Sequence, residues 1–205
     1  MYVERLLYPV TTLGPGNRVV LWLEGCSKHC WGCANPEMWE TESTSDLSES
    51  HVANILKQLC KEQGAHRITF TGGDPLEQPE QLATLLELIR PEFDDVLVYT
   101  GYELDEARSI VSPSIMSRIE SNIDVLIDGP YMDELNDGLS SLRGSTNQVI
   151  HYFNPTVEKQ YETYLENGRS VMNVVSNGKI VSVGIHNREV LADRNEHQIE
   201  EAYRE

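Results

Sequence analysis

Basic residues are scarce in this chain of 205 residues, in which 16 Lys and Arg stand against 33 Asp and Glu and give a formal net charge of -17. Such a charge argues against a surface for nucleic acid or anionic lipid, because both need clustered cations. Long apolar runs are also missing, and a bilayer-spanning helix needs about 20 apolar residues. The N-terminal stretch has no basic region followed by an apolar segment and a small-residue cleavage site, as a signal peptide would. We therefore expect a cytoplasmic protein with no nucleic-acid partner and no membrane partner.

Cysteine is also scarce, yet three of the four cysteines lie between positions 26 and 33. In a reducing compartment, the C-x3-C-x2-C spacing of Cys26, Cys30 and Cys33 indicates a metal or catalytic site before it indicates disulfides. A structural zinc site usually has four protein ligands, often as two C-x2-C pairs, and no second pair occurs here. His29 adjoins Cys30 and cannot easily face the same ion, so we interpret it as a loop histidine. Three thiolates suit a [4Fe–4S] cube that keeps one iron free for a non-protein ligand.

Short apolar runs alternate with amphipathic stretches along the chain. Runs rich in β-branched and aromatic residues predict buried strands over residues 18–25, 67–73, 95–102, 123–130 and 147–153. Apolar residues at helical spacing predict helices over residues 48–64, 79–91 and 156–168. This alternation predicts an α/β fold with a parallel sheet, open or rolled into a barrel, and ligands of such sheets bind at the carboxyl ends of the strands. The residues that fall at these ends are Gly25, Gly72, Thr100 and Asp128.

The pattern changes after Gly168. Residues 169–187 indicate two strands joined through Asn177-Gly178, the pair that best tolerates the positive φ angles of a two-residue type I′ turn. We expect an appended β-hairpin near the rim of the site, as a docking element or as cover for an exposed sheet edge. The residues that follow are mostly charged and predict a short terminal helix or a frayed tail. The chain is thus divided into a core domain, residues 1–168, and a C-terminal hairpin with a charged tail, residues 169–205.

Further motifs turn the cysteine spacing into a family resemblance. The C-x3-C-x2-C loop is similar to the cluster loop of the radical S-adenosylmethionine (SAM) superfamily, and TFTGGDP at residues 69–75 resembles the glycine-rich motif after the second strand of that superfamily. A narrower resemblance is to the activating enzymes of the anaerobic ribonucleotide reductase, whose further motifs occur here in the same order. They are Gly14-Pro15-Gly16, TGY at residues 100–102, DGP at residues 128–130 and RGSTNQ at residues 143–148. The resemblance covers roughly residues 5–153.

The resemblance implies a partial (β/α)6-type radical SAM barrel with a [4Fe–4S] cluster and SAM as cofactors. In that superfamily the free iron chelates the amino and carboxylate groups of SAM, and an electron passed through the cluster cleaves the sulfonium to give a 5′-deoxyadenosyl radical. In the activase branch the radical takes a backbone hydrogen from a separate glycyl-radical enzyme. The implied electron donor is a low-potential protein such as flavodoxin or ferredoxin.

Carried over residue by residue, the resemblance assigns the cluster to Cys26, Cys30 and Cys33. It assigns the methionyl amine of SAM to Gly72, Gly73 and Asp74, where adjacent glycines let the main chain approach a ligand and a carboxylate suits an ammonium. The other implied SAM contacts, toward the carboxylate, the ribose or a nearby cation, are Thr100, Asp128, Arg143, Ser145 and Asn147. An arginine suits a carboxylate because its guanidinium donates two parallel hydrogen bonds.

Two features depart from the activase pattern. Ala34 follows the third cysteine, where the branch often has an aromatic residue, and the hairpin lies beyond the compact form of the reductase activase. Both features put in question which molecule is the target of the radical, and neither affects the SAM chemistry. Three functions therefore stay open. The first is a glycyl-radical activase, and the second is a radical SAM enzyme that acts directly on a small molecule or peptide. The third is a non-catalytic metal-binding module.

Three other residues have simpler interpretations. Cys60 lies on the apolar side of a helical pattern and is predicted to be a small core residue. Trp31 and Trp39 flank the cysteine loop, where they either shield it or belong to a partner surface.

Overall fold

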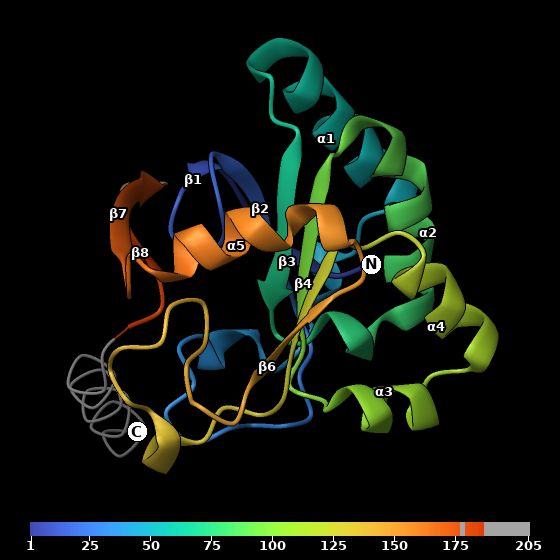
Figure 1. The fold of residues 1–205 in the computed structure, drawn as a ribbon. Helices are drawn as coiled ribbons and strands as arrows, with labels where there is room; N and C mark the ends of the chain where they lie inside the picture. Colours follow the sequence, from blue (N-terminus) through green and yellow to red (C-terminus); the bar gives the residue numbers. More distant parts are fainter. Residues whose placement is uncertain (177–178, 187–205) are drawn as a thin grey trace.

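The protein contains a six-stranded sheet whose spatial order follows the chain (Figure 1). A computed structural model describes residues 1–176 and 179–186, and the statements below concern these residues. The strands are β1 (Val3–Val10), β2 (Arg18–Leu23), β3 (Arg67–Gly72), β4 (Asp95–Tyr99), β5 (Val125–Asp128) and β6 (Val149–Tyr152). The five strands predicted from apolar runs are confirmed as β2 to β6, whereas β1 was not predicted.

The sheet is parallel in its centre and antiparallel at both edges. Strands β2, β3, β4 and β5 pair in parallel, whereas β1 runs antiparallel to β2 and β6 runs antiparallel to β5. The prediction of a parallel sheet is therefore right for β2 to β5 and wrong for β6. A parallel neighbour needs a crossover connection, usually a helix. Residues 129–148, between β5 and β6, contain a 3₁₀ turn at Asp133–Leu135 and no α-helix, so the chain returns in the opposite direction.

Helices cover one face of the sheet. These are α1 (Glu49–Gln63), α2 (Pro79–Ile89), α3 (Leu104–Ile110) and α4 (Pro113–Glu120), which Figure 1 shows on the same side of β3 and β4. Helix α1 begins where the Ser48 side chain accepts a hydrogen bond from the His51 N–H, and it ends at Gly64, whose φ of 66° is left-handed. The predicted helices at residues 48–64 and 79–91 are confirmed. No helix in the described part of the chain is long and apolar enough to cross a membrane.

Alternation along β2 supplies apolar side chains to both faces. Leu21 and Leu23 belong to the main core with α1 and α2, whereas Val20 and Trp22 belong to a second cluster on the opposite face. Helix α5 (Glu158–Leu165), predicted over residues 156–168, packs on that opposite face, where Tyr161 is buried in a third cluster. Both faces of the sheet are therefore covered.

The predicted hairpin is confirmed as β7 (Val171–Ser176) paired antiparallel with β8 (Lys179–Gly184). The predicted turn at Asn177-Gly178 and the charged tail, residues 187–205, lie outside the described residues. The two strands form a separate sheet rather than extending an edge of the large one. Val183, 2% exposed, packs into the cluster that contains Trp22. The hairpin thus covers the face of β1 and β2.

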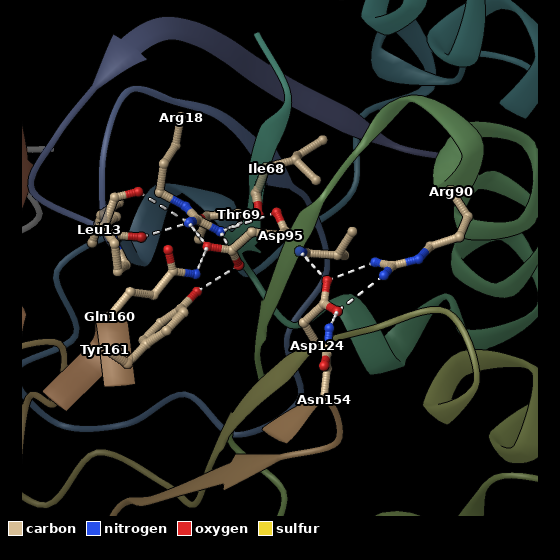
Figure 2. Close-up of polar contacts among 12 residues, drawn as sticks. Leu13, Arg18, Ile68, Thr69, Arg90, Asp95, Asp124, Asn154, Gln160 and Tyr161 are labelled. Atoms are coloured by element: carbon tan, nitrogen blue, oxygen red, sulfur yellow. Dashed lines mark hydrogen bonds and ion pairs between the residues drawn. The ribbon is translucent and has the colours of Figure 1, made fainter. Parts of the chain in front are cut away.

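A buried ion pair fixes the amino ends of the central strands (Figure 2). The Arg18 guanidinium contacts the Asp95 carboxylate with both terminal nitrogens, at 2.7 and 3.2 Å, and their side chains are 0% and 2% exposed. Arg18 Nε also donates to the Thr69 hydroxyl at 2.8 Å, and the Tyr161 hydroxyl donates to Asp95 at 2.8 Å. This network joins the starts of β2 and β4 to β3 and α5.

A second network at the amino end of the sheet centres on Asp124, which precedes β5 (Figure 2). Arg90 donates to both carboxylate oxygens, at 2.6 and 3.0 Å, and the Asn154 side chain donates at 2.7 Å. The Val96 N–H of β4 donates at 2.7 Å. With these ends fixed by polar contacts, the opposite ends of the strands are available for a site.

Candidate functional site

One cavity lies at the carboxyl ends of the central strands and gathers most of the predicted site. Its lining includes the predicted residues Cys26, Cys30, Cys33, Gly72, Gly73, Asp74 and Thr100. The three cysteines follow β2, Gly72 ends β3 with Gly73 and Asp74 directly after it, and Thr100 follows β4. Parallel strands with matched registers bring their carboxyl ends to one edge, so residues far apart in the sequence meet there.

The base of the cysteine loop, residues 25–39, is closed by backbone hydrogen bonds. The Gly25 N–H donates to the Met38 carbonyl and the Cys26 N–H to the Trp39 carbonyl, both at 2.9 Å. Within the loop, the His29 ring stacks on the Trp39 ring with centroids 4.6 Å apart. The loop is thus a closed structure in which His29 is engaged by an aromatic neighbour.

The three thiols fit an iron–sulfur cluster in number and chemistry. Cys26, Cys30 and Cys33 are half-buried and line the same cavity. Burial raises the pKa of the Cys26 and Cys33 thiols, because desolvation disfavours the thiolate, and bound iron would reverse that balance. In the described residues no three His, Cys, Asp or Glu side chains are arranged to hold a metal ion. A [4Fe–4S] cube binds each thiolate at a separate iron, so its three ligands do not need to converge on one ion.

A polar clamp that was not predicted holds the cysteine loop to the neighbouring strand ends. The Glu77 carboxylate accepts hydrogen bonds from the Ser27 N–H at 3.0 Å, the Ser27 hydroxyl at 2.5 Å and the Tyr102 hydroxyl at 2.8 Å. Lys28 Nζ lies 3.7 Å from the centre of the Tyr102 ring and donates to Glu106 at 3.0 Å. Tyr102 belongs to the TGY motif, but the motif did not predict its contact with Glu77, and Glu77 belongs to none of the motifs.

The clamp keeps its carboxylate ionised. Burial acts to raise the pKa of Glu77, but the hydrogen bonds from Ser27 and Tyr102 and the charge of Lys28 outweigh it, so the pKa is lower than usual. A carboxylate that stays charged accepts stronger hydrogen bonds than a neutral acid. The Ser27 end of the loop is therefore held by charge-assisted contacts.

The glycine pair after β3 joins the cysteine loop directly. The Gly73 N–H donates to the Leu23 carbonyl and the Asp74 N–H donates to the Gly25 carbonyl, each at 2.7 Å. A Cβ at Gly72 would collide with Leu23, and a Cβ at Gly73 would collide with the carbonyl group of Gly25. Close packing of two backbones thus requires glycine here, a reason separate from the predicted approach of a ligand.

Asp74 lines the cavity with a buried carboxylate, 1% exposed. It accepts hydrogen bonds from the Leu76 N–H at 2.9 Å, the Gly101 N–H at 2.7 Å and the Thr100 hydroxyl at 2.9 Å. Burial raises the pKa of Asp74 to about 6 in spite of these donors. Because a buried anion is stabilised by a nearby cation, this carboxylate suits a positively charged ligand group.

Asp128 does not line the cavity, although it ends β5 as predicted. Its carboxylate accepts a hydrogen bond from the Leu104 N–H at the start of α3, at 2.7 Å, and lies 2.9 Å from His151 Nε2. The neighbouring residue, Gly129, lines the cavity instead. The structure therefore gives Asp128 a position that joins α3 and β6.

The RGSTNQ segment folds back on the DGP segment, and its predicted SAM contacts stand beside the cavity rather than in its lining. The Ser145 hydroxyl accepts from the Met132 N–H at 3.1 Å, and the Asn147 amide donates to the Pro130 carbonyl at 2.8 Å. Arg143 Nη1 donates to the Gln148 carbonyl at 3.2 Å. In the described structure Arg143 Nε and Asn147 Oδ1 are buried without a hydrogen-bond partner. Their predicted roles toward SAM stay predictions.

The hairpin lies at the site, as expected, but no residue of the hairpin and no residue at the end of β4 before Thr100 was predicted to line the cavity. Residues 182–186, at the end of the β7–β8 hairpin, line the cavity together with Trp22 and Leu13. Tyr99, the last residue of β4, also lines it, and burial raises the pKa of its hydroxyl. Tyr99 directly precedes the TGY motif in the sequence, whereas residues 182–186 stand far from every motif of the site and reach it through folding alone.

Comparison with known proteins matches the part of the chain that contains the cysteine loop and the GGD motif. Residues 12–151 match the family model described as a 4Fe-4S single cluster domain. The chain is 36% identical over 155 residues to an Escherichia coli protein named anaerobic ribonucleoside-triphosphate reductase-activating protein, covering 71% of this chain and 95% of that protein. Proteins of the same name from Haemophilus influenzae, 36% identical over 157 residues, and Vibrio cholerae, 33% identical over 160 residues, have the same coverage. The hairpin lies beyond the C-terminal end of the family match.

Proposed function

The chain belongs to the family of anaerobic ribonucleoside-triphosphate reductase-activating proteins, and on that premise we propose that it is a radical SAM enzyme that installs a glycyl radical on such a reductase. The observation that carries the proposal is the joining of two motifs in one cavity. The Asp74 N–H of the GGD motif donates to the carbonyl of Gly25, the residue before Cys26. The thiols and the GGD turn therefore belong to one unit, at the mouth of a sheet that we propose acts as a partial barrel.

Cys26, Cys30 and Cys33 would hold the [4Fe–4S] cluster, which when bound supplies the electron for reductive cleavage of SAM and an open iron for its amino and carboxylate groups. The loop fixes the positions of the thiols before any ligand binds, through its closed base and the Glu77 clamp. A preorganised site of this kind avoids the entropic cost of ordering the loop when the ligand arrives.

The turn after β3 would receive the ammonium of SAM. An ammonium has three donors and no acceptor. The N–H groups of Gly73 and Asp74 already donate to carbonyls of the cysteine loop and its strand, so recognition falls to acceptors, namely the Asp74 carboxylate and backbone carbonyls of the turn. Thr100 and the Gly101 N–H hold that carboxylate in place.

The partner would be a glycyl-radical enzyme, and the electron would come from a low-potential donor such as flavodoxin or ferredoxin. Trp31 lies beside Cys30 in the loop and is 70% exposed. An indole this exposed cannot shield the cluster, which favours the interpretation of Trp31 as part of a partner surface. Trp39, in contrast, packs on His29.

A second candidate function, direct action on a small molecule or peptide, is favoured by one observation. The hairpin residues 182–186 line the cavity, so the site has a wall that an open face for a large partner does not need. The test incubates reduced protein and SAM anaerobically with each candidate glycyl-radical enzyme and records the electron paramagnetic resonance doublet of a glycyl radical. Appearance of the doublet supports the activase. The second function would replace the activase if 5′-deoxyadenosine accumulates with a small molecule or peptide and no candidate enzyme gives the doublet.

The cluster assignment has its own test. Anaerobically reconstituted protein is expected to bind about four irons per chain and to show a reduced-cluster signal that changes on addition of SAM. Cys30→Ala should abolish both. Cys60→Ala is the matched control, because Cys60 is 5% exposed in α1 and its thiol contacts the Ala65 carbonyl. Iron content and SAM cleavage that survive Cys30→Ala would refute the assignment.

A further inference from the structure

The C-terminal hairpin is built into the cavity that holds the thiols. Ser182, Val183, Gly184 and Ile185 of the hairpin and its exit line the same cavity as Cys26. The family match ends at residue 151, before β7 begins. Part of the site wall therefore comes from a segment outside the family domain.

The hairpin is anchored where it meets the cavity. The Val183 side chain is 2% exposed and packs with Val10, Leu13 and Trp22. The Val183 carbonyl accepts a hydrogen bond from the buried Thr12 hydroxyl at 2.9 Å. Apolar burial and a satisfied buried hydroxyl together fix this stretch of β8 against the start of the chain.

A buried arginine ties the end of the hairpin to the other side of the cavity. The side chain of Arg169, 5% exposed, donates to the His186 carbonyl at 2.9 Å. It also donates to the carbonyls of Ser140 at 3.1 Å, Gly144 at 3.1 Å and Arg143 at 3.2 Å. Since Gly144 lines the cavity, one guanidinium connects two walls of the site.

The two sides of the cavity differ in chemistry. On the side of β3 and β4 the lining is polar and includes the Asp74 carboxylate. On the hairpin side, over β1 and β2, it includes Leu13, Trp22, Val183 and Ile185. The polar groups on this side are Arg5, whose guanidinium lies 5.8 Å from the centre of the Trp22 ring, and a pair in which Ser182 Oγ lies 2.8 Å from His186 Nε2. Apolar walls with a few placed polar groups suit a heteroaromatic base, whereas a charged amino-acid group needs the polar side.

We propose that the β7–β8 hairpin is a wall of the substrate site, and that residues 182–186 hold the nucleoside end of the ligand whose amino-acid end lies at the thiols. The identity of that ligand as SAM rests on the proposed function. The wall itself does not. Access to the thiols then depends on the hairpin, and a variant that detaches the hairpin opens the cavity.

The first experiment tests the wall without any ligand. Full-length protein freed of iron is labelled anaerobically with a small reagent, iodoacetamide, and with a bulky polyethylene glycol maleimide, and labelling of Cys26, Cys30 and Cys33 is followed by peptide mass spectrometry. Val183→Asp places a carboxylate in an apolar cluster, so we expect the bulky reagent to react about tenfold faster or more. Val175→Asp is the matched control, since Val175 lies on the same hairpin and is 76% exposed. Equal rates of labelling by the bulky reagent in wild type and Val183→Asp would show that the hairpin does not restrict access to the thiols.

The second experiment tests the nucleoside end. S-adenosylhomocysteine and L-methionine are titrated into reconstituted protein by calorimetry. Ser182→Ala, a small change in a half-buried residue, is expected to weaken S-adenosylhomocysteine binding about three- to tenfold and to leave methionine binding unchanged. Unchanged S-adenosylhomocysteine affinity, or equal loss for both ligands, would overturn the assignment. Failure of wild-type protein to bind either ligand would instead refute the proposed function. The labelling result would still decide whether the hairpin forms a wall of the cavity.

Discussion

Replacing Arg18 by Met is expected to lower the free energy of unfolding by about 3–5 kcal/mol, the usual cost of leaving one member of a buried ion pair without its partner. Methionine is about as long as the apolar part of arginine, so the change removes charge and donors more than volume. The Arg18 side chain is 0% exposed, and it donates to Asp95, to the Thr69 hydroxyl and to a backbone carbonyl. None of these acceptors gains water when the guanidinium is lost.

The cost falls mainly on Asp95, which would keep two donors. The Tyr161 hydroxyl lies 2.8 Å from one carboxylate oxygen and the Gln160 amide lies 3.2 Å from the other. These donors satisfy the geometry of a carboxylate but do not neutralise its charge. Adding Asp95→Asn to Arg18→Met removes the uncompensated charge and keeps acceptor and donor groups in place. The double variant should therefore recover about half of the loss, a non-additivity expected for residues in contact.

The measurement is urea unfolding of iron-free protein under anaerobic, reducing conditions, followed by tryptophan fluorescence and far-ultraviolet circular dichroism. Arg108→Met serves as the control, because Arg108 pairs with Glu120 at 2.8 Å but is 47% exposed, and exposed pairs contribute little. The reasoning is refuted if Arg18→Met costs less than about 1 kcal/mol. It is also refuted if the double variant loses as much as the two single variants together.

Three further predictions concern the site. Because burial raises the pKa of Asp74 to about 6, a cationic ligand should bind more tightly as the pH rises through that value and the carboxylate becomes charged. Calorimetry from pH 5 to 8 should show this trend in the wild type and not in Asp74→Asn. The same trend in both proteins would contradict the prediction. Glu77→Gln should speed the loss of iron to a chelator about fivefold, since it weakens a charge-assisted clamp. Substitution of an exposed residue, Glu80→Gln, should leave the rate unchanged. Equal rates of iron loss in wild type and Glu77→Gln would show that the clamp does not stabilise the cysteine loop. Gly73→Ala should lower iron incorporation, because its Cβ would collide with the Gly25 carbonyl; normal iron content by colorimetric assay would show that the loop accommodates the methyl group.

The central strands were predictable because each is a compact apolar run with glycine or a polar residue at its end. Strand β1 was missed because Pro9 interrupts its pattern, and proline is tolerated in a strand at an edge or irregularity. The pairing of β1 with β2 shifts register between Leu7 and Val10, around that proline. The direction of β6 was mispredicted because direction depends on the connection. No helix was predicted between β4 and β5 or between β5 and β6, yet the first connection contains α3 and α4 and the second contains only a 3₁₀ turn.

The position of the site was predictable where its signal is local. Three cysteines within one loop and a glycine pair followed by an acid mark it in the sequence, and these residues line one cavity. The Glu77 clamp and the hairpin wall join residues far apart in the sequence, such as Ser27 with Glu77 and Thr12 with Val183, and no spacing rule detects them. Asp128 illustrates a finer limit. Side chains alternate at a strand end, and here Asp128 contacts the start of α3 whereas Gly129 lines the cavity.

The arrangement of supports around the cysteine loop explains how a hairpin could be added without altering the thiols. The clamp from Glu77 and Tyr102 and the backbone bonds from the GGD turn reach the loop from β3 and β4. The hairpin packs instead over β1 and β2, through Val183 and Thr12. Met38 of the cysteine loop packs in the same cluster as Val183, but the Glu77 clamp and the GGD turn share no residue with the hairpin contacts. We therefore expect the hairpin to affect the wall and the access of the site more than the geometry of the loop. Variation in the C-terminal segment is therefore expected to act on which molecules reach the thiols rather than on whether the thiols can hold iron.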